Sequence, residues 1–263
     1  MGNIIVSSSF VDVASANITT RTASTGYDAI NVMDRWNLKQ RFRAGDANTN
    51  DWLMKFYFGG VQTIVGILLY DVNFSKVKIQ GHGADSWGGS LDYAGTDLTV
   101  SQNAITGRYQ IYIPLTAFTP TYSRIFIPSG TAAVSGYTTK WEIGAVCFLS
   151  SVTTLVHNVS YGYEQTGKHF YKTSVNERIQ TGEEIRWQGR LPFGNRSTAN
   201  EAELWALNRM NMAQPFVYYE NGSDTSAAYL CIRDDAVAIT QFTYGGVTGN
   251  SIAIKEVYKI GED

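Results

Sequence analysis

Apolar and polar residues alternate with a period of two over most of the chain, and clusters of Gly, Asn, Asp and Ser interrupt the alternation. Successive side chains of a strand point to opposite faces, so this pattern predicts β-strands that bury one face. We expect strands at residues 4–6, 51–58, 63–70, 76–81, 108–114, 122–127 and 142–149. Short strands separated by turn signals are typical of an all-β sandwich.

Two of these segments carry further information. Residues 51–58 have one largely apolar face and run into Gly59-Gly60, which supplies the positive φ that a tight turn needs. Residues 64–70 are almost continuously apolar, and the run is too short to span a membrane. We therefore predict that both faces of this second strand are buried.

The alternation breaks after Val152, and a chain of 263 residues is long enough for two cores. We predict a β-sandwich domain at residues 1–153 and a second, β-rich domain at residues 154–263. Strands of the second domain are expected at residues 184–190, 215–220, 227–233, 236–243 and 251–257, with a turn at Asn221-Gly222.

One helix is expected near residues 199–212. Thr198 and Glu201 have the spacing of a capping box, in which two side chains bond to free backbone N–H groups at a helix start. Pro215 then ends the helix. The predicted fold class is therefore all-β and mainly antiparallel, with one short helix in the second domain.

The charge and the aromatic content of the chain indicate which kinds of partner it can bind. The formal net charge is −2 and Lys and Arg form no run, so we expect no nucleic-acid partner. Charged residues make up 17% and aromatic residues 13% of the chain, a balance that favours contact with other protein surfaces and a homo-oligomer. We expect no membrane insertion and no secretory signal, because no segment has the required apolar length or basic start.

The two cysteines, Cys147 and Cys231, lie in apolar, strand-like segments. Nothing in the sequence brings their β-carbons within bonding range, so we expect buried free thiols. Free thiols are typical of proteins made in a reducing compartment.

Motifs of catalysis are missing. The histidines, His82, His157 and His169, have no metal-ligand spacing, and no nucleophile elbow or phosphate-binding loop is present. The adjacent acids Glu183-Glu184 and Asp234-Asp235 would point to opposite faces of a strand. We expect no enzyme activity, no catalytic residue, no metal and no cofactor, although the members of a Ser/His/Asp triad need not be neighbours in sequence.

Four segments occur in a fixed order: residues 31–34, 39–43, 51–59 and 61–70. Together they resemble the opening of a discoidin-like, or galactose-binding-like, β-sandwich, in which a loop with an Asp precedes a short strand ending in Trp and Arg. A Trp-Leu strand closing on Gly and a strand of apolar residues follow. This chain departs from the family at Phe42, which replaces the tryptophan, and at residues 56–58. The resemblance implies a jelly-roll sandwich in the first half of the chain and leaves its ligand open.

Relatives of this sandwich are known to bind calcium, an ion that takes oxygen ligands from loops. Asp85, Asp92 and Asp97 lie in one long loop and could provide such ligands. Their spacing lacks the EF-hand pattern, so we favour ordinary loop acids.

Loops at one end of the sandwich offer a contact patch for a ligand or partner, formed by Trp36, Arg41, Asp46 and Trp87. An indole stacks on the apolar face of a sugar ring, and Arg or Asp binds the hydroxyls. For Trp36 a contact role and a structural cap are equal alternatives, and for Trp87 we favour an indole folded back over the sandwich. Arg43 is instead expected to pair with a carboxylate inside the sandwich.

The second domain looks similar to domains of tail and baseplate proteins of tailed bacteriophages. Our first hypothesis is a non-enzymatic structural virion protein of the tail tip or baseplate, made in the host cytoplasm, which assembles with itself and docks other tail proteins. The alternative is a carbohydrate-binding module or receptor-binding adhesin whose ligand is a host surface glycan. A polysaccharide-cleaving enzyme would need converging acids that the sequence does not reveal.

Overall fold

The computed structural model of the protein describes residues 3–35, 40–136, 138–156, 160–166, 169–172, 178–181, 184–191, 214–221, 224–233, 239–242, 246–249 and 252–257. Among these residues no helix is long and apolar enough to cross a bilayer. The helix predicted near residues 199–212 lies outside the described residues.

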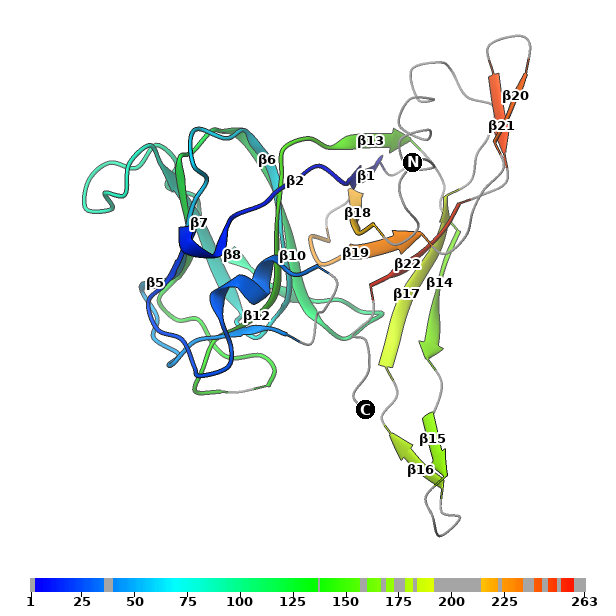
Figure 1. Ribbon diagram of the computed structural model, residues 1–263, viewed down its shortest axis with the longest axis horizontal. Helices are drawn as coiled ribbons and strands as arrows, with labels where there is room; N and C mark the ends of the chain where they lie inside the picture. The colour runs from blue at the N-terminus through cyan, green and yellow to red at the C-terminus, as the bar shows by residue number, and fades with distance from the viewer. Residues whose placement is uncertain are drawn as a thin grey trace.

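Two sheets form a sandwich (Figure 1). The middle sheet has the order β2 (Phe10–Val11), β12 (Glu142–Leu149), β6 (Ile64–Val72), β10 (Tyr109–Phe118) and β9 (Ser101–Gln102), and β4 (Phe42–Arg43) also pairs with β12. The outer sheet has the order β3 (Ile18–Thr20), β5 (Asp51–Tyr57), β11 (Tyr122–Ile127), β7 (Lys76–His82) and β8 (Leu98–Thr99). Two short 3-10 helices, η1 (Ser15–Asn17) and η2 (Ala29–Met33), lie in the connections.

A third sheet, which we call the long sheet, contains seven strands. Its order is β13 (Thr153–Val156), β1 (Asn3–Ser7), β18 (Phe216–Asn221), β19 (Ala228–Arg233), β22 (Ile252–Glu256), β17 (Glu184–Leu191) and β14 (Ser160–Thr166). Two hairpins stand apart from it: β15 (His169–Lys172) with β16 (Arg178–Thr181), and β20 (Ile239–Phe242) with β21 (Gly246–Gly249).

Every strand pair in the described part of the chain is antiparallel. The predicted all-β, mainly antiparallel fold is therefore confirmed, and each strand predicted before Val152 is present. The alternation does not predict β2, β3, β4, β8 and β9, because these strands have only two or three residues each. Gly59 has the expected positive φ, 75°.

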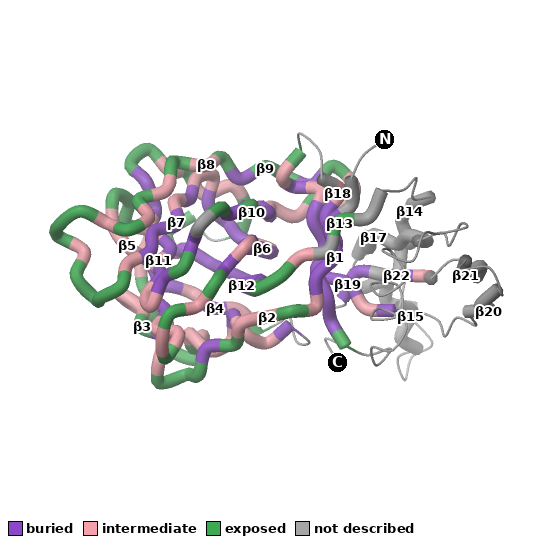
Figure 2. Tube along the Cα trace, turned by 90° about the horizontal axis from the view of Figure 1, so that it is seen from above, coloured by how far each residue is buried: buried purple, intermediate pink, exposed green. Residues whose placement is uncertain are grey.

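The middle sheet is buried on both faces. Leu69 and Val146 belong to the sandwich core, which faces the outer sheet. The neighbouring residues Leu68 and Cys147 belong to a second core that faces the long sheet. All eight residues of β12 are buried, and Figure 2 shows that the buried positions continue into β18 and β19. The predicted burial of both faces of β6 is confirmed, and a third layer is its cause.

Stacked rings join the layers in the second core, and the Cys147 thiol lies in the same core. The rings of Tyr112 in β10 and Tyr219 in β18 stack at 4.4 Å between centroids. Cys147 and Cys231 are free and buried, as predicted. Burial raises the pKa of the Cys147 thiol to about 11, so this group is a neutral component of the core at neutral pH.

A buried polar network also crosses this second interface. Glu256 in β22 is fully buried, and Arg108 binds it with an Nη1–Oε1 distance of 2.7 Å. The Tyr70 hydroxyl donates to the same carboxylate and lies 3.0 Å from Arg108 Nη1. Burial raises the pKa of Tyr70 well above its usual value, so its hydroxyl remains a donor. An ion pair in such a place needs these extra hydrogen bonds, because desolvation of both charges is costly.

The first strand belongs to the long sheet, together with strands from the far half of the chain. In β1, Ile5 lies opposite Thr154 of β13 on one side and Tyr219 of β18 on the other. The predicted domain boundary at residues 153 and 154 stays a prediction, and β1 makes contacts across it.

We predict that Glu256→Gln lowers the free energy of unfolding by about 3 kcal/mol, because Arg108 keeps its buried charge without the balancing carboxylate. Urea denaturation measures the change. The control is Asp97→Asn, which breaks an ion pair with Lys78 whose carboxylate side chain is 52% exposed, and which should cost less than about 1 kcal/mol. Equal effects of the two substitutions would show that the network does not stabilise the packing of the layers.

Candidate functional site on the outer sheet

Arg41 of the predicted contact patch and its neighbour Arg43 both bind carboxylates inside the sandwich. Arg41 Nη2 lies 2.7 Å from Asp71 Oδ2, and its Nη1 lies 3.3 Å from Glu142 Oε2. Arg43 Nε binds the other oxygen of Glu142 at 2.6 Å. The expected internal carboxylate partner of Arg43 is confirmed, and Arg41 shares it. These arginines hold β4 against β12.

Asp46 is bound to Arg21. Arg21 Nη1 donates to Asp46 Oδ2 at 3.1 Å, and the backbone N–H of Asn48 donates to Oδ1. Burial pushes the pKa of Asp46 upward, but the hydrogen bonds and the charge of Arg21 outweigh it and hold the pKa below its usual value. Asp46 is therefore ionised and partly exposed, and its hydrogen bonds hold the loop after β4 against Arg21.

Trp36 lies outside the described residues, and Trp87 lies against the outer sheet. No hydrogen bond, ion pair or ring contact joins Arg41, Asp46 and Trp87 to one another in the described part of the chain. Their role as ligand contacts stays a prediction.

The outer sheet turns one face away from the sandwich core, and the register of β5, β11 and β7 arranges that face in three rows. The rows are Trp52, Phe126 and Lys78; Lys55, Arg124 and Gln80; and Tyr57, Tyr122 and His82. We call these nine residues the aromatic–cationic face. In β11 the three members of this face alternate with the buried residues Ser123, Ile125 and Ile127, as a half-buried strand requires. This face lies at the end of the molecule away from the long sheet (Figure 1).

A β-bulge keeps the first row in place. The register of β5 shifts between Met54 and Trp52, so Leu53 and Met54 are both buried and Trp52 returns to the outward face. Simple alternation would have turned Trp52 or Lys55 inward.

Cations lie over the rings of the face. Lys55 Nζ lies 4.7 Å from the centre of the Trp52 ring, and Arg124 Cζ lies 5.4 Å from that of Phe126. The rings of Tyr57 and Tyr122 stack at 4.8 Å. Such contacts fix the direction of long side chains that would otherwise be mobile.

The loop of residues 83–97 folds back onto this face and brings Trp87 to its centre. The Arg124 guanidinium lies 4.3 Å from the centre of the Trp87 ring. The Trp87 indole N–H donates to Asp85, which also binds Lys55 at 3.0 Å. The sequence interpretation that we favoured for Trp87 was an indole folded back over the end of the sandwich, and the structure instead places the folded-back indole on the outward face of the outer sheet.

The three acids of the loop bind three different basic side chains. Asp85 pairs with Lys55, Asp92 with His82 at 2.9 Å, and Asp97 with Lys78 at 2.8 Å. No group of three or more His, Cys, Asp or Glu side chains in the described residues is arranged to hold a metal ion. The adjacent acids at positions 183 and 234–235 lie outside the described residues.

Arg124 differs from the other cations of the face. Its Nε donates to Gln80 Oε1 at 2.5 Å, and no carboxylate of the described residues lies within ion-pair distance of it. Burial lowers its pKa, while the charges of Asp51 and Asp85 act in the opposite direction. Arg124 therefore places its hydrogen-bond donors between the rings of Trp87 and Phe126, and no carboxylate of the described residues forms an ion pair with it.

No protein-family model matches the sequence, and no curated protein is similar to it. Solved structures with a partial likeness of fold include three sugar-binding modules or domains. A mutant of chitosan-binding module 1 from a chitosanase/glucanase of Paenibacillus sp. IK-5 is 18% identical, and the match covers 53% of this chain and 96% of the module with a TM-score of 0.37. The lectin domain of lectinolysin complexed with Lewis B antigen is 13% identical, and the match covers 51% of this chain and 92% of that domain with a TM-score of 0.33. A fucose-binding module of Streptococcus pneumoniae is 8% identical, and the match covers 54% of this chain and 98% of the module with a TM-score of 0.34. At such TM-scores the likeness does not bear on the ligand of this chain.

We predict that acidification releases Trp87 from its hydrogen bond. The bond from Trp87, followed by that from Lys55, holds the pKa of Asp85 below its ordinary value of 3.8. A depressed pKa means that the contact is fully present above that ordinary value and is lost as the pH falls through the lower value of the folded protein. The fluorescence difference between the wild type and Trp87→Phe, followed from neutral pH downward, measures the release.

Asp85→Asn should reproduce the fluorescence change at neutral pH, because a neutral amide is a weaker acceptor for the indole N–H than a carboxylate and no longer attracts Lys55. The control is Asp97→Asn, whose carboxylate binds Lys78 and does not touch Trp87. A titration that is unchanged by Asp85→Asn would assign the signal to another group.

Proposed function

We propose that this chain is a non-catalytic carbohydrate-binding protein and that a glycan lies along the aromatic–cationic face. The observation that carries the proposal is the placement of aromatic rings and fixed hydrogen-bond donors side by side on one outward sheet face. The proposal does not rest on the solved structures above.

The rings suit the apolar side of a sugar. A pyranose presents C–H groups on its flat faces and hydroxyls around its edge, and an aromatic ring can pack against the C–H groups. Trp52, Trp87 and Phe126 are all partly exposed, so each retains area that a ligand can cover. Their positions on neighbouring strands and on the overlying loop allow a chain of sugar units to contact more than one ring.

The polar members suit the hydroxyls. Lys55 and Arg124 donate hydrogen bonds, and Gln80 and Asp85 can accept them. Each of these groups is already held by a neighbour, Arg124 by Gln80 and Lys55 by Asp85. A preorganised site loses less side-chain entropy on binding, which favours affinity for a weakly held ligand.

The face provides binding groups rather than a catalytic pair. Hydrolysis of a glycosidic bond uses two carboxyl groups that flank it. The acids of the loop are instead bound to cations of the face, and hydrogen bonds from His82 and Gly83 N–H hold the pKa of Asp92 below its usual value. Such carboxylates are poor general acids at neutral pH.

A glycan array tests the proposal directly. We expect saturable binding to at least one glycan, and Trp87→Ala should weaken it about tenfold or more, which corresponds to about 1.4 kcal/mol. Arg124→Gln should weaken glycan binding as well, because the shorter, neutral amide has fewer N–H donors than the guanidinium between the rings.

The matched control is Tyr27→Ala. Tyr27 also lies under a guanidinium, that of Arg43 at 3.8 Å, but it is not part of the aromatic–cationic face. It should leave glycan binding unchanged, and thermal unfolding should show that all variants fold. The proposal is falsified if no glycan binds saturably, or if Tyr27→Ala and Trp87→Ala reduce binding equally.

The location in a phage tail, self-assembly and docking to other tail proteins stay predictions that rest on the sequence resemblance. The solved structures reported above include no virion protein. A glycan-binding tail protein would satisfy both hypotheses, and a host surface glycan would then be its ligand.

A further inference from the structure

A second concave site lies where the chain crosses from the long sheet to the middle sheet. Ser7 ends β1 and pairs with Val217, whereas Phe10 begins β2 and pairs with Leu149. The crossing residues between them border a pocket of about 320 Å³. Its lining includes Ser8, Phe10, Asp12, Met33, Arg35 and Gln214.

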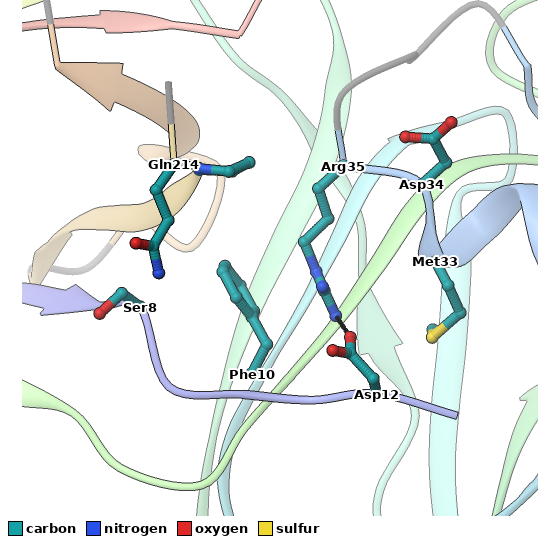
Figure 3. A pocket seen from close by; sticks show the side chains of 8 residues that line it. Ser8, Phe10, Asp12, Met33, Asp34, Arg35 and Gln214 are labelled. Carbon is teal, nitrogen blue, oxygen red and sulfur yellow. Dashed lines mark hydrogen bonds and ion pairs between the residues drawn. The ribbon is translucent and has the colours of Figure 1, made fainter. Parts of the chain in front are cut away.

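Arg35 is the central residue of this pocket (Figure 3). It is only 9% exposed, and its guanidinium lies 4.0 Å from the centre of the Phe10 ring. Its Nη2 donates to Asp12 Oδ1 at 2.7 Å, and the guanidinium also interacts with the buried Cys147 thiol, while no hydrogen bond is formed by its buried Nε. A buried guanidinium with five N–H groups and an unmatched nitrogen is costly to maintain, and such groups often mark a site of function.

The partner of Arg35 is open to solvent. The Asp12 side chain is 75% exposed, and only its Oδ1 is bound to Arg35. Figure 3 shows the Gln214 amide and the Ser8 hydroxyl on the opposite side of Phe10 from Asp12, and it shows Asp34 pointing away from the guanidinium. The pocket thus presents a fixed donor, a free carboxylate oxygen, an amide and a hydroxyl.

The charges of the lining select the ligand class. Asp12 and Arg35 balance each other's charge, so this pair favours a neutral ligand over an ion. A neutral ligand with vicinal hydroxyls can accept from Arg35 with one oxygen and donate to Asp12 with the next. The apolar side of its ring can pack on Met33 and Pro215, and the volume is at the lower end of ligand pockets.

We infer that this pocket binds a single neutral, hydroxylated ring, such as one hexose unit, and that it is a site separate from the aromatic–cationic face. The inference does not need the proposed function, because the two sites share no residue.

Saturation-transfer NMR and calorimetry with glucose, galactose and mannose test the pocket on the full chain. We expect one of these hexoses to bind with a dissociation constant of roughly 1 mM, a value that suits a few hydrogen bonds on a small ligand. Asp12→Asn should weaken binding at least fivefold, because the acceptor for the ligand hydroxyl loses its charge. Gln214→Ala should weaken it by a smaller factor.

Asp12 and Gln214 are exposed, so both variants are expected to fold, whereas Arg35 is too buried to be a first choice. Trp87→Ala is the matched control and should leave hexose binding unchanged while it weakens binding on the glycan array. Absence of hexose binding at tens of millimolar, or equal binding by wild type, Asp12→Asn and Gln214→Ala, would overturn the inference. Loss of hexose binding in Trp87→Ala would assign the sugar to the aromatic–cationic face, and tighter binding of gluconate than of glucose would contradict the neutral ligand class.

Discussion

In the middle sheet the central strands are covered on both faces, and the rest of the structure follows from that constraint. Its strands β6 and β12 bury both faces, so the outer sheet must cover one and the long sheet the other. Polar groups on the covered side then need partners within the protein. Tyr70 and Arg108 find theirs in Glu256, and Gln110 donates its amide to the carbonyl of Ser226 at 2.9 Å. The polar bonds fix the position of one layer on the other, since apolar contact alone has little directional preference.

This layering decides where a ligand can bind. Because the long sheet covers one side of the sandwich, the outward side of the outer sheet is the broad sheet face that the sandwich leaves to solvent. Trp52, Tyr57, Tyr122 and Phe126 on this face remain partly exposed, and the loop that carries Trp87 lies over Arg124 between them. The chain passes from the long sheet to the middle sheet between β1 and β2, and the pocket beside Arg35 lies at that crossing.

Local features of the fold could be predicted from the sequence, and long-range ones could not. The apolar run of β6 indicates burial on both faces, and the expected internal carboxylate partner of Arg43 is Glu142. The third layer could not be predicted in this way. Alternation of apolar and polar residues separates the buried face of a strand from its exposed face, but it does not identify the sheet that packs on the buried face.

The aromatic–cationic face could likewise be predicted only in part. Tyr122, Arg124 and Phe126 alternate visibly in one segment, but their neighbours Trp52 and Lys55 come from another strand, whose bulge shifts the alternation. The pocket combines three distant segments that share no motif.

The position of β1 has a consequence for how the chain reaches its native state. This apolar strand precedes β13 and β18 by about 150 and 210 residues in the chain, yet it lies between them in the long sheet, so its partners are made much later. Pairings between such distant segments form slowly, because the loop that they close is long. Until β18 emerges, both edges of β1 lack their native partners and can pair with strands of other chains. Protection of this segment during synthesis is therefore a requirement that the topology itself imposes.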